Sequence, residues 1–241
     1  MRILVTGSRR GIGAAIAVGL SEPGRTLLIH HLAFPGEAAR VAGACRERGA
    51  AAEILEADLS DPAALGSLVT SAGDVDILIN NAARASNVDI GVLTLAEWQA
   101  TFAVNVTAPM LLAQAFSAGM AARGWGRIVN ITSATVRLGG TSGPSYVSSK
   151  AALVGLTRSL ARTLGEHGIT VNAVSPGAID TEGEVELAKG PLPHAEIIAQ
   201  QVVPRRLVPD DLVGAVRYLV SDGASATTGQ VLEVGGGLVF R

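Results

Sequence analysis

Residues 1–20 read MRILVTGSRRGIGAAIAVGL, and this opening stretch decides the fold. Residues 2–6 form a largely apolar run that ends at Gly7, and residues 12–20 carry apolar side chains at helical spacing. A short apolar run without polar alternation is typical of a strand buried on both faces of a parallel sheet. The stretch therefore predicts a strand, a glycine-rich turn and a helix, in that order.

The same alternation continues along the chain. Further apolar runs span residues 26–30, 52–57, 76–79, 126–132, 169–174 and 230–234. Stretches with helical spacing follow them at residues 35–48, 61–71, 95–123, 145–166 and 209–221. Repeated strand–helix units join by right-handed crossovers into a doubly wound sheet. We therefore expect an α/β fold: a single Rossmann-type domain over residues 1–241, with about seven parallel strands and helices on both faces.

One stretch, residues 176–206, departs from this rhythm. Glycines and prolines interrupt it throughout, so it is too broken for one long helix and too long for an ordinary turn. Long irregular insertions in compact domains are often lids, and we interpret this one as a substrate lid. Its acidic residues Glu182, Glu184 and Glu186 lack a histidine or aspartate that would complete a ligand set, so we expect no metal site.

Composition excludes several classes of function. Of the 241 residues, 48% are hydrophobic and 17% are charged, which supplies a large core and argues against disorder. The net charge of −2 comes without a concentrated basic surface, so we expect no nucleic-acid partner. No apolar run reaches the roughly 18 residues of a membrane helix, and the opening strand leaves no room for a signal peptide. The single cysteine, Cys45, fits a reducing compartment, so we expect a cytoplasmic protein.

The glycine-rich turn indicates nucleotide binding. Gly7 allows a sharp turn, Gly11 lets the backbone approach a pyrophosphate, and Gly13 lets the helix pack close to the sheet. Amide groups at the start of the helix, beside Ile12, then face the phosphates. The spacing is G-x-x-x-G-x-G rather than G-x-G-x-x-G, and a tight connector alone would also use glycines. The position between the first strand and the first helix favours a dinucleotide site.

The end of the second predicted strand favours NADP(H) over NAD(H). Residues 28–33 contain no carboxylate that would bind the ribose hydroxyls and repel a 2′-phosphate. Ser8, Arg9 and Arg10 offer a hydroxyl and two guanidinium groups nearby, although both arginines could instead be solvated loop charges. His31 could also touch the 2′-phosphate. Asp58 and Leu59, after the third predicted strand, are expected beside the adenine.

Tyr146 and Lys150 lie four residues apart, so both side chains share one face of a predicted helix. The lysine ammonium would lower the phenol pKa from its ordinary value near ~10 toward the range useful for acid–base catalysis. Ser133 follows the strand predicted at residues 126–132, where its hydroxyl could bind a substrate carbonyl. It is a poor hydrolase nucleophile, because no G-x-S-x-G turn surrounds it.

Over essentially its full length the chain resembles the short-chain dehydrogenase/reductase family. The matching elements are Thr6-Gly7-x-x-x-Gly11-Ile12-Gly13, Asp58-Leu59, Asn80-Asn81-Ala82-Ala83, Asn105, Ser133, Tyr146-x-x-x-Lys150, Pro176-Gly177, Thr228-Gly229-Gln230 and Gly235-Gly236-Gly237. The resemblance implies that Tyr146 is the general acid in reduction and that Lys150 lowers its pKa and holds the nicotinamide ribose. It further implies that Ser133 orients the carbonyl and that Asn105 anchors a water in the proton relay.

The resemblance also implies the remaining cofactor contacts. Asn81 and Ala82 would line the adenosine side; Pro176, Gly177 and Ile179 the nicotinamide side; and Thr181 would meet the carboxamide or phosphates. In this family the helices predicted at residues 95–123 and 145–166 build dimer and tetramer contacts, so we expect a homotetramer.

Within the family the chain looks most like the 3-oxoacyl-[acyl-carrier-protein] reductases of fatty acid biosynthesis. That similarity implies NADPH-dependent reduction of a ketone, with a 3-oxoacyl thioester as substrate and acyl-carrier-protein as a possible partner. An acidic carrier requires basic groups beside the cleft, for which Arg123 and Arg127 are candidates; Glu166-His167 stands where such reductases often carry arginine. The alternatives are an NADP(H)-dependent alcohol or sugar dehydrogenase, a reductase of a free small ketone, and a dinucleotide-binding protein without activity.

Overall fold

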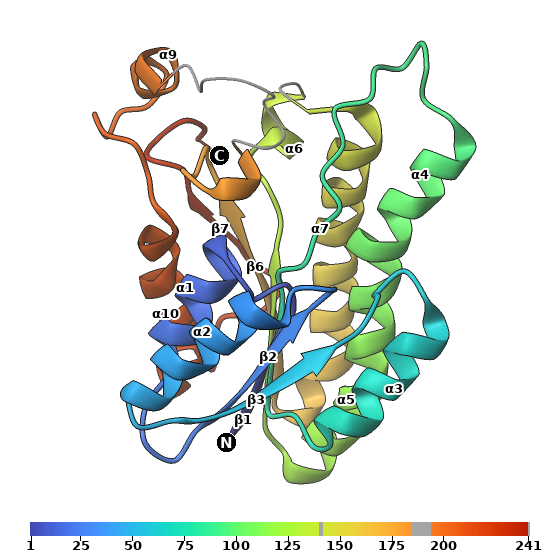
Figure 1. Ribbon diagram of the computed structural model, residues 1–241, viewed down its shortest axis with the longest axis vertical. Coiled ribbons are helices and arrows are strands. Elements are labelled where there is room, and N and C mark those ends of the chain that lie inside the picture. The colour runs from blue at the N-terminus through green and yellow to red at the C-terminus, as the bar shows by residue number, and fades with distance from the viewer. Residues whose placement is uncertain (140–141, 185–193, 241) are drawn as a thin grey trace.

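The computed structural model describes residues 1–139, 142–184 and 194–240. Within these residues seven parallel strands form one sheet in the order β3-β2-β1-β4-β5-β6-β7 (Figure 1). The strands are β1 (Arg2–Val5), β2 (Thr26–His31), β3 (Ala51–Glu56), β4 (Ile77–Asn80), β5 (Gly126–Ile131), β6 (Ile169–Pro176) and β7 (Val231–Val234). The predicted doubly wound parallel sheet is confirmed.

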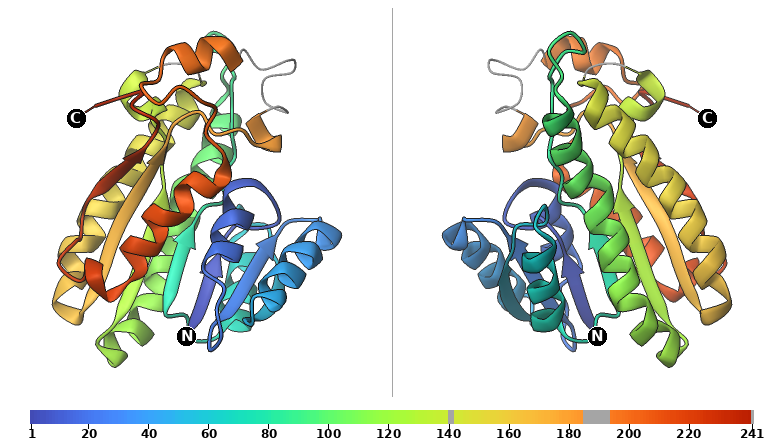
Figure 2. Two further views of the ribbon diagram at one scale, coloured as in Figure 1. Left: turned by 90° about the vertical axis from the view of Figure 1, so that its left-hand side faces the viewer. Right: turned by 90° about the vertical axis from the view of Figure 1, so that its right-hand side faces the viewer.

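Helices cover both faces of this sheet (Figures 1 and 2). The longer ones are α1 (Gly11–Gly19), α2 (Pro35–Glu47), α3 (Pro62–Ala72), α4 (Leu95–Phe102), α5 (Ala108–Arg123), α7 (Pro144–Leu164) and α10 (Val213–Val220). Short ones are the π-helix η1 (Ala103–Thr107), α6 (Thr135–Leu138), η2 (Gly165–His167), α9 (His194–Ala199), η3 (Pro209–Leu212) and η4 (Asp222–Ala224). Helices α1, α2 and α10 pack on one face, and α3, α5 and α7 on the other.

The two faces of the sheet carry separate hydrophobic cores. Along β1, Ile3 and Val5 pack in the core of α1, α2 and α10, whereas Leu4 packs in the core of α3, α5 and α7. Successive side chains of a strand point to opposite faces, so a strand buried on both faces must be apolar throughout. The run predicted at residues 52–57 is the exception: β3 forms the edge of the sheet, and most of its residues are exposed or half-buried.

The position of β1 places a crevice in the sheet. β1 lies between β2 and β4, so the chain turns to one side after β1 and to the other side after β4. The loops that leave these two strands therefore diverge. In open α/β sheets such a switch point at the carboxyl ends of the strands is where ligands bind.

The stretch 95–123, predicted as one helix, contains the π-helix η1 between α4 and α5. By length and composition alone, the stretch is long and apolar enough to cross a membrane. That is weak evidence, because a core helix of a globular domain meets the same criteria. In α5, Leu112, Phe116 and Met120 pack in the core of α3, α5 and α7, which accounts for the apolar composition.

The stretch interpreted as a lid begins later than predicted, because β6 extends to Pro176. Residues 177–184 run beside residues 205–207: Ile179 pairs with Leu207, and Arg206 forms a 2.6 Å ion pair with Glu184. The central part of the proposed lid, residues 185–193, lies outside the described residues. The lid therefore stays a prediction.

A chain of buried polar side chains ties the sheet to α7. Asn80 of β4 donates to Asn130 of β5 (2.8 Å), Asn130 donates to the Thr157 hydroxyl (2.9 Å), and Thr157 donates to the Leu153 carbonyl (2.8 Å). The Thr157 hydroxyl is thus the acceptor that Asn130 needs in a site closed to water. This chain fixes how α7 lies on β5.

Replacing Thr157 with Val should destabilise the protein, because it leaves the buried Asn130 amide without an acceptor at a cost of about 1–3 kcal/mol. Thr163→Val is the matched control: Thr163 is also on α7 and also donates to a carbonyl one turn earlier, but it is exposed. Urea unfolding should show a lower midpoint for Thr157→Val alone. Equal midpoints for the two variants would contradict this role of Thr157.

Candidate active site

A cleft of about 400 Å³ opens at the carboxyl ends of the strands, at the switch point between β1 and β4. Twelve of the residues predicted to bind a cofactor line it: Gly7, Arg9, Arg10, Gly11, Ile12, Gly13, His31, Asp58, Leu59, Asn81, Ala82 and Thr181. His30, Leu32, Ala57, Ala83, Val104, Glu182 and Gly183 complete the lining. Residues from six separate parts of the chain therefore meet in one cavity.

The glycine-rich turn is packed so closely that side chains are excluded from it. Gly7 has φ +63° and Gly11 has φ +56°, a region that favours glycine. A Cβ on Gly13 would lie 2.5 Å from both the Asn81 Nδ2 atom and the Gly7 carbonyl oxygen. Arg10, the N-cap of α1, gives the helix no side-chain cap. The turn therefore presents a smooth backbone cradle at a helix N-terminus, which fits the pyrophosphate of a dinucleotide.

Thr6, which the sequence analysis gave no role beyond the motif, joins the turn to the end of β4. Its hydroxyl accepts hydrogen bonds from the backbone N–H groups of Asn81 and Ala82, each at 3.0 Å. The Asn81 amide donates in return to the carbonyls of Thr6 (2.9 Å) and Gly7 (3.1 Å). These hydrogen bonds thus join the two loops that diverge at the switch point, at the residues where each loop leaves its strand.

Ser8 does not offer its hydroxyl to a ligand as the sequence analysis expected. The side chain is fully buried, and its hydroxyl donates to the Val5 carbonyl (2.8 Å) and accepts from the His30 N–H (3.0 Å). It satisfies backbone groups that the sharp turn frees from the β1–β2 ladder. Ser8 therefore shapes the turn and does not line the cleft.

Arg9 lines the cleft but already has a partner. Its guanidinium pairs with Glu37 in the first turn of α2 and lies 3.9 Å from the ring centroid of Phe34. Glu37 lies beyond the end of β2, so the absence of a carboxylate at that strand end did not predict it. His31, also in the lining, accepts a hydrogen bond from the Phe34 N–H (3.3 Å). The ion pair holds the guanidinium at the mouth of the cleft.

Asp58 lines the cleft directly after Ala57, whose backbone N–H donates to the His31 carbonyl (3.1 Å). Its carboxylate accepts from the backbone N–H of Ser60 (2.8 Å) and from the Ser60 hydroxyl (2.7 Å). These bonds favour the ionised form and lower the pKa of Asp58.

His30 supports the glycine-rich turn from below. Its Nδ1 atom accepts a hydrogen bond from the Gly7 N–H (2.9 Å), and its Nε2 atom lies 3.1 Å from the Ala57 carbonyl. The neutral ring with its proton on Nε2 satisfies both groups. Burial of the ring lowers the pKa of His30 to about 4.

The predicted catalytic side chains gather at the ends of β5 and at the start of α7. Ser133 follows β5 and is hydrogen-bonded to the Tyr146 phenol, while the Lys150 Nζ atom lies 5.7 Å from the centroid of the Tyr146 ring. The buried Lys150 donates to the Ile131 carbonyl at 2.8 Å. The hydroxyl, phenol and ammonium predicted from sequence thus lie together.

The electrostatics of this group differ from the sequence-based expectation. Burial raises the pKa of the Tyr146 phenol, and the opposing hydrogen bond from Ser133 is the smaller influence. The Lys150 ammonium donates to the Ile131 carbonyl and lies 5.7 Å from the centroid of the Tyr146 ring, and its expected influence on the pKa of the phenol stays a prediction. Burial lowers the pKa of Lys150 to about 8. Tyr146 therefore holds its proton at neutral pH, as a general acid must.

Thr135, which the sequence analysis missed, holds the hydroxyl of Ser133. The Thr135 hydroxyl lies 2.9 Å and its backbone N–H 3.3 Å from the Ser133 Oγ atom, and both donate to it. A serine hydroxyl has two lone pairs and one hydrogen. With both lone pairs engaged, the hydrogen of Ser133 is directed away from α6 and toward the Tyr146 phenol.

Asn105 lies fully buried in the π-helix η1. Its amide exchanges hydrogen bonds with the backbone of Arg84 (2.8 and 3.1 Å) and donates to the Ser149 hydroxyl (2.9 Å). The Ser149 hydroxyl donates to the Tyr146 carbonyl (2.7 Å). Asn105 therefore links the β4–α4 loop to the turn of α7 that carries Tyr146.

The three residues predicted on the nicotinamide side lie at and beyond the end of β6. The Pro176 carbonyl accepts from the N–H of Ala134, the residue after Ser133 (2.8 Å), which places Pro176 beside the catalytic group. A Cβ on Gly177 would lie 2.7 Å from the Gly235 Cα atom, so this position requires close backbone packing. Ile179 is 5% exposed and packs in the core of α1, α2 and α10, so its side chain faces away from the cleft.

The two arginines considered as carrier-protein contacts lie at the wrong edge of the sheet. Arg127 is near the amino end of β5, and Arg123 ends α5 just before it, so both are at the edge opposite the cleft. Arg123 pairs with Asp74 and Asp76, and Arg127 is 3% exposed. Within this chain they cannot flank the entrance of its own cleft.

Comparison with known proteins agrees with this geometry. A sequence model of a protein family, described as "Enoyl-(Acyl carrier protein) reductase", matches residues 7–239. A 3-oxoacyl-[acyl-carrier-protein] reductase of Synechocystis sp. is 33% identical over 243 residues, covering 98% of this chain and 96% of that protein. The chain belongs to the short-chain dehydrogenase/reductase family.

Solved structures of other short-chain dehydrogenases/reductases superimpose closely. A 3-oxoacyl-[acyl-carrier-protein] reductase of Agrobacterium tumefaciens with NADP bound has a TM-score of 0.91 and 33% identity, covering 98% of this chain and 93% of that one. A gluconate 5-dehydrogenase of Burkholderia cenocepacia in complex with NADP and tartrate has a TM-score of 0.89 and 31% identity, covering 98% and 94%. The protein is an NAD(P)-dependent oxidoreductase of this family, and NADP(H) is its cofactor.

The buried imidazole of His30 makes the stability of the glycine-rich turn depend on pH. The folded-state pKa of His30, about 4, lies below its ordinary value of 6.5, so the unfolded chain binds more protons between these limits. The contribution of His30 to the free energy of unfolding is therefore complete above pH 6.5 and falls as the pH drops toward about 4. Protonation would also place a second donor against the Gly7 N–H.

We expect thermal stability and NADPH affinity to fall more steeply from pH 7 to pH 5 in the parent protein than in His30→Asn, whose side-chain oxygen can accept from Gly7 without titrating. His167→Asn is the control, because His167 is exposed. Melting curves and NADPH fluorescence titrations at both pH values provide the measurement. Parallel pH profiles for parent and His30→Asn would refute the effect.

Proposed function

We propose that the protein reduces a ketone to a secondary alcohol with NADPH, using Tyr146 as the proton donor. The observation that carries this proposal is the convergence of the Ser133 hydroxyl, the Tyr146 phenol and the Lys150 ammonium beside a cleft with a glycine cradle. When bound, NADPH supplies the hydride that the carbonyl carbon receives. The reverse reaction would use the same residues with Tyr146 as base.

The residues of the chain account for the proton and for the charge that develops on oxygen. Tyr146 gives its proton to the carbonyl oxygen, and the Ser133 hydroxyl donates a hydrogen bond to the same atom as negative charge grows there. Lys150, with a pKa of about 8, can return a proton toward Tyr146 near neutral pH. Asn105 would keep the backbone of η1 in place for a water in this relay.

The cofactor contacts follow from the lining of the cleft. Gly7, Gly11, Ile12 and Gly13 would receive the pyrophosphate; Arg9, Arg10 and His31 the 2′-phosphate; and Asp58, Leu59, Asn81 and Ala82 the adenosine. Thr181, Pro176, Gly177, Tyr146 and Lys150 would meet the nicotinamide half. Ser8 and Ile179 would not contact the cofactor through their side chains; they would only fix the backbone of the loops that line its site.

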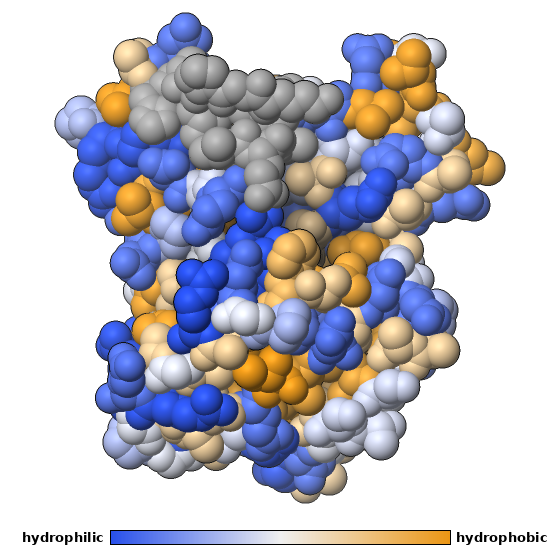
Figure 3. All heavy atoms as spheres, in the orientation of Figure 1, coloured by the Kyte–Doolittle hydropathy of each residue, from blue (hydrophilic) through white to orange (hydrophobic). Residues whose placement is uncertain are grey.

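We propose a 3-oxoacyl thioester as the substrate, because an apolar rim of exposed side chains lies on the loop that leads from β4 into α4. Ile90, Val92 and Leu95 are each at least 70% exposed, and Figure 3 shows apolar side chains over this loop. The loop reaches the catalytic helix, since the Gly143 N–H donates to the Ser86 carbonyl (2.8 Å). An acyl chain would bury such side chains, whereas a sugar would not.

The rim gives no preference for a carrier protein over another thioester. Basic side chains near the catalytic group already have carboxylate partners: Arg84 pairs with Glu97 (2.7 Å) and Arg137 with Glu233 (3.0 Å). An acidic carrier would have to compete with these ion pairs. The homotetramer and the single domain over residues 1–241 stay predictions.

Oxidation of a sugar acid or sugar is the second candidate, favoured by the likeness to the gluconate 5-dehydrogenase. Two assays distinguish these candidate functions. One follows NADPH consumption with acetoacetyl-CoA and longer 3-oxoacyl-CoA esters, and the other follows NADP⁺ reduction with gluconate. The proposal expects kcat/KM to rise with acyl chain length and to exceed the value for gluconate. A preference for gluconate, or no dependence on chain length, would reject the thioester.

Tyr146→Phe should lower kcat by about 10²–10⁴-fold, because it removes the proton donor and leaves the ring. NADPH affinity should stay near that of the parent. Tyr218→Phe is the matched control, since Tyr218 is half-exposed and its hydroxyl contacts only Thr227 (2.9 Å) among the described residues. Steady-state kinetics and NADPH fluorescence would report both quantities; an active Tyr146→Phe enzyme overturns the assignment.

Thr135→Val should lower kcat about tenfold, because the Ser133 hydroxyl loses the shorter of the two hydrogen bonds that direct its hydrogen outward. Losing the Ser133 hydrogen bond would also raise the pKa of Tyr146 further, so the basic limb of the pH–rate profile should move to higher pH. Thr135→Ser keeps the hydroxyl and should restore both properties. A normal pH profile in Thr135→Val would mean that Thr135 has only a structural role.

A further inference from the structure

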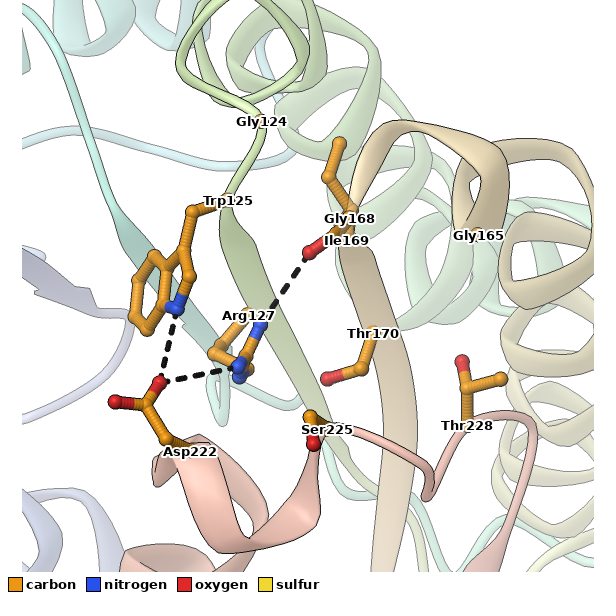
Figure 4. A pocket seen from close by; sticks show the side chains of 10 residues that line it. All are labelled: Gly124, Trp125, Arg127, Gly165, Gly168, Ile169, Thr170, Asp222, Ser225 and Thr228. Atoms are coloured by element: carbon orange, nitrogen blue, oxygen red, sulfur yellow. Dashed lines mark hydrogen bonds and ion pairs between the residues drawn. The ribbon is translucent and has the colours of Figure 1, made fainter.

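A second cavity, of about 430 Å³, lies at the amino ends of β5 and β6, on the edge of the sheet opposite the cofactor cleft (Figure 4). Its wall includes Trp125 and Arg127 at the start of β5, Thr170 at the start of β6, and Asp222, Ser225 and Thr228 from the segment between α10 and β7. The proposed reaction uses none of these residues.

The floor of this cavity is a buried guanidinium whose charge is poorly compensated. Arg127 is 3% exposed and lies 4.3 Å from the centroid of the Trp125 ring. Its Nη1 atom donates to the carbonyls of Gly126 (2.9 Å) and Gly168 (3.4 Å), but its Nε atom has no acceptor among the described residues. The nearest carboxylate, Asp222, is 3.5 Å away and its side chain is 90% exposed. Burying a charge with so loose a partner is unfavourable.

A buried hydroxyl without a partner lies beside this guanidinium. Thr170 is paired with Arg127 across the β5–β6 ladder and is 6% exposed. Its hydroxyl has no hydrogen-bond partner among the described residues, and Figure 4 shows it pointing toward Arg127. Buried polar groups are rarely unsatisfied, so an unpaired hydroxyl next to an underpaired guanidinium indicates a site for an acceptor.

We propose that this cavity binds a small anion through a carboxylate or phosphate group, which accepts hydrogen bonds from Arg127 and Thr170. Ser225 supplies a hydroxyl at the rim, and Trp125 forms an apolar wall. The exposed Asp222 carboxylate competes with the ligand for Arg127 and must move aside when it binds. The site is independent of the proposed reaction, because it lies at the opposite ends of the strands.

Trp125 can report binding directly, because the chain has only two tryptophans, Trp98 and Trp125. Trp98→Phe preserves an aromatic ring to stack on Phe102 and leaves Trp125 as the single tryptophan, which can be excited selectively. This protein, saturated with NADP⁺ to occupy the phosphate cradle of the cofactor cleft, is titrated with inorganic phosphate or with succinate at constant ionic strength. We expect a saturable change in fluorescence below ~10 mM; the anion that saturates first distinguishes a phosphate from a carboxylate ligand.

Two substitutions in the Trp98→Phe protein should change the affinity for the anion in opposite directions. Thr170→Val removes an unsatisfied hydroxyl, so it should preserve the fold while weakening the anion about tenfold. Asp222→Asn keeps an acceptor for the Trp125 indole (3.1 Å) but removes the competing charge, so it should tighten binding several-fold. A signal that does not saturate, unchanged affinity in Thr170→Val, or weaker binding in Asp222→Asn would each overturn the proposal.

Discussion

The close contact between the glycine-rich turn and the end of β4 is the constraint on which the site depends. Gly13 packs so near Asn81 and the Gly7 carbonyl that no side chain fits, and Thr6 ties the same two loops together through its hydroxyl. These bonds satisfy backbone groups that the diverging chain would otherwise leave unpaired at the switch point. The cleft is therefore held open by the fold itself, and the amide groups that face a pyrophosphate are positioned before any ligand arrives.

Burial determines the chemistry of the catalytic group more than the proximity of charges does. Tyr146 and Lys150 are both enclosed, and enclosure favours the neutral form of each: it raises the pKa of the phenol and lowers that of the ammonium to about 8. The pKa values of the two groups are thereby moved apart, so that Tyr146 holds its proton more tightly than Lys150 does. Ser133 acts in the other direction on the phenol, and Thr135 determines which way the serine hydrogen points. Proton transfer thus depends on four side chains, of which the motif identifies three.

Sequence patterns predicted the sheet and most of the site, because strand periodicity and glycine spacing are local signals. Apolar runs located all seven strands to within two residues at each end, and glycines located the cradle. The failures concern what lies beside a residue in space: Glu37 next to Arg9, the buried orientation of Ser8 and Ile179, and the position of Arg127 at the far edge. The exposure of β3 was missed for the same reason, since an apolar run in the sequence does not show that its strand lies at the edge of the sheet.

The π-helix η1 has a consequence for how the helical stretch 95–123 is built. A π turn accommodates one more residue than an α turn, so α4 and α5 are out of phase by one position on either side of Ala103–Thr107. Deleting one residue there would restore an unbroken α-helix and rotate every side chain of α4 by about 100° relative to α5. Asn105 would lose its partners while the core of α5 stayed intact. The one extra residue of the π turn is thus what lets a helix of the core also place Asn105 against its partners near the active site.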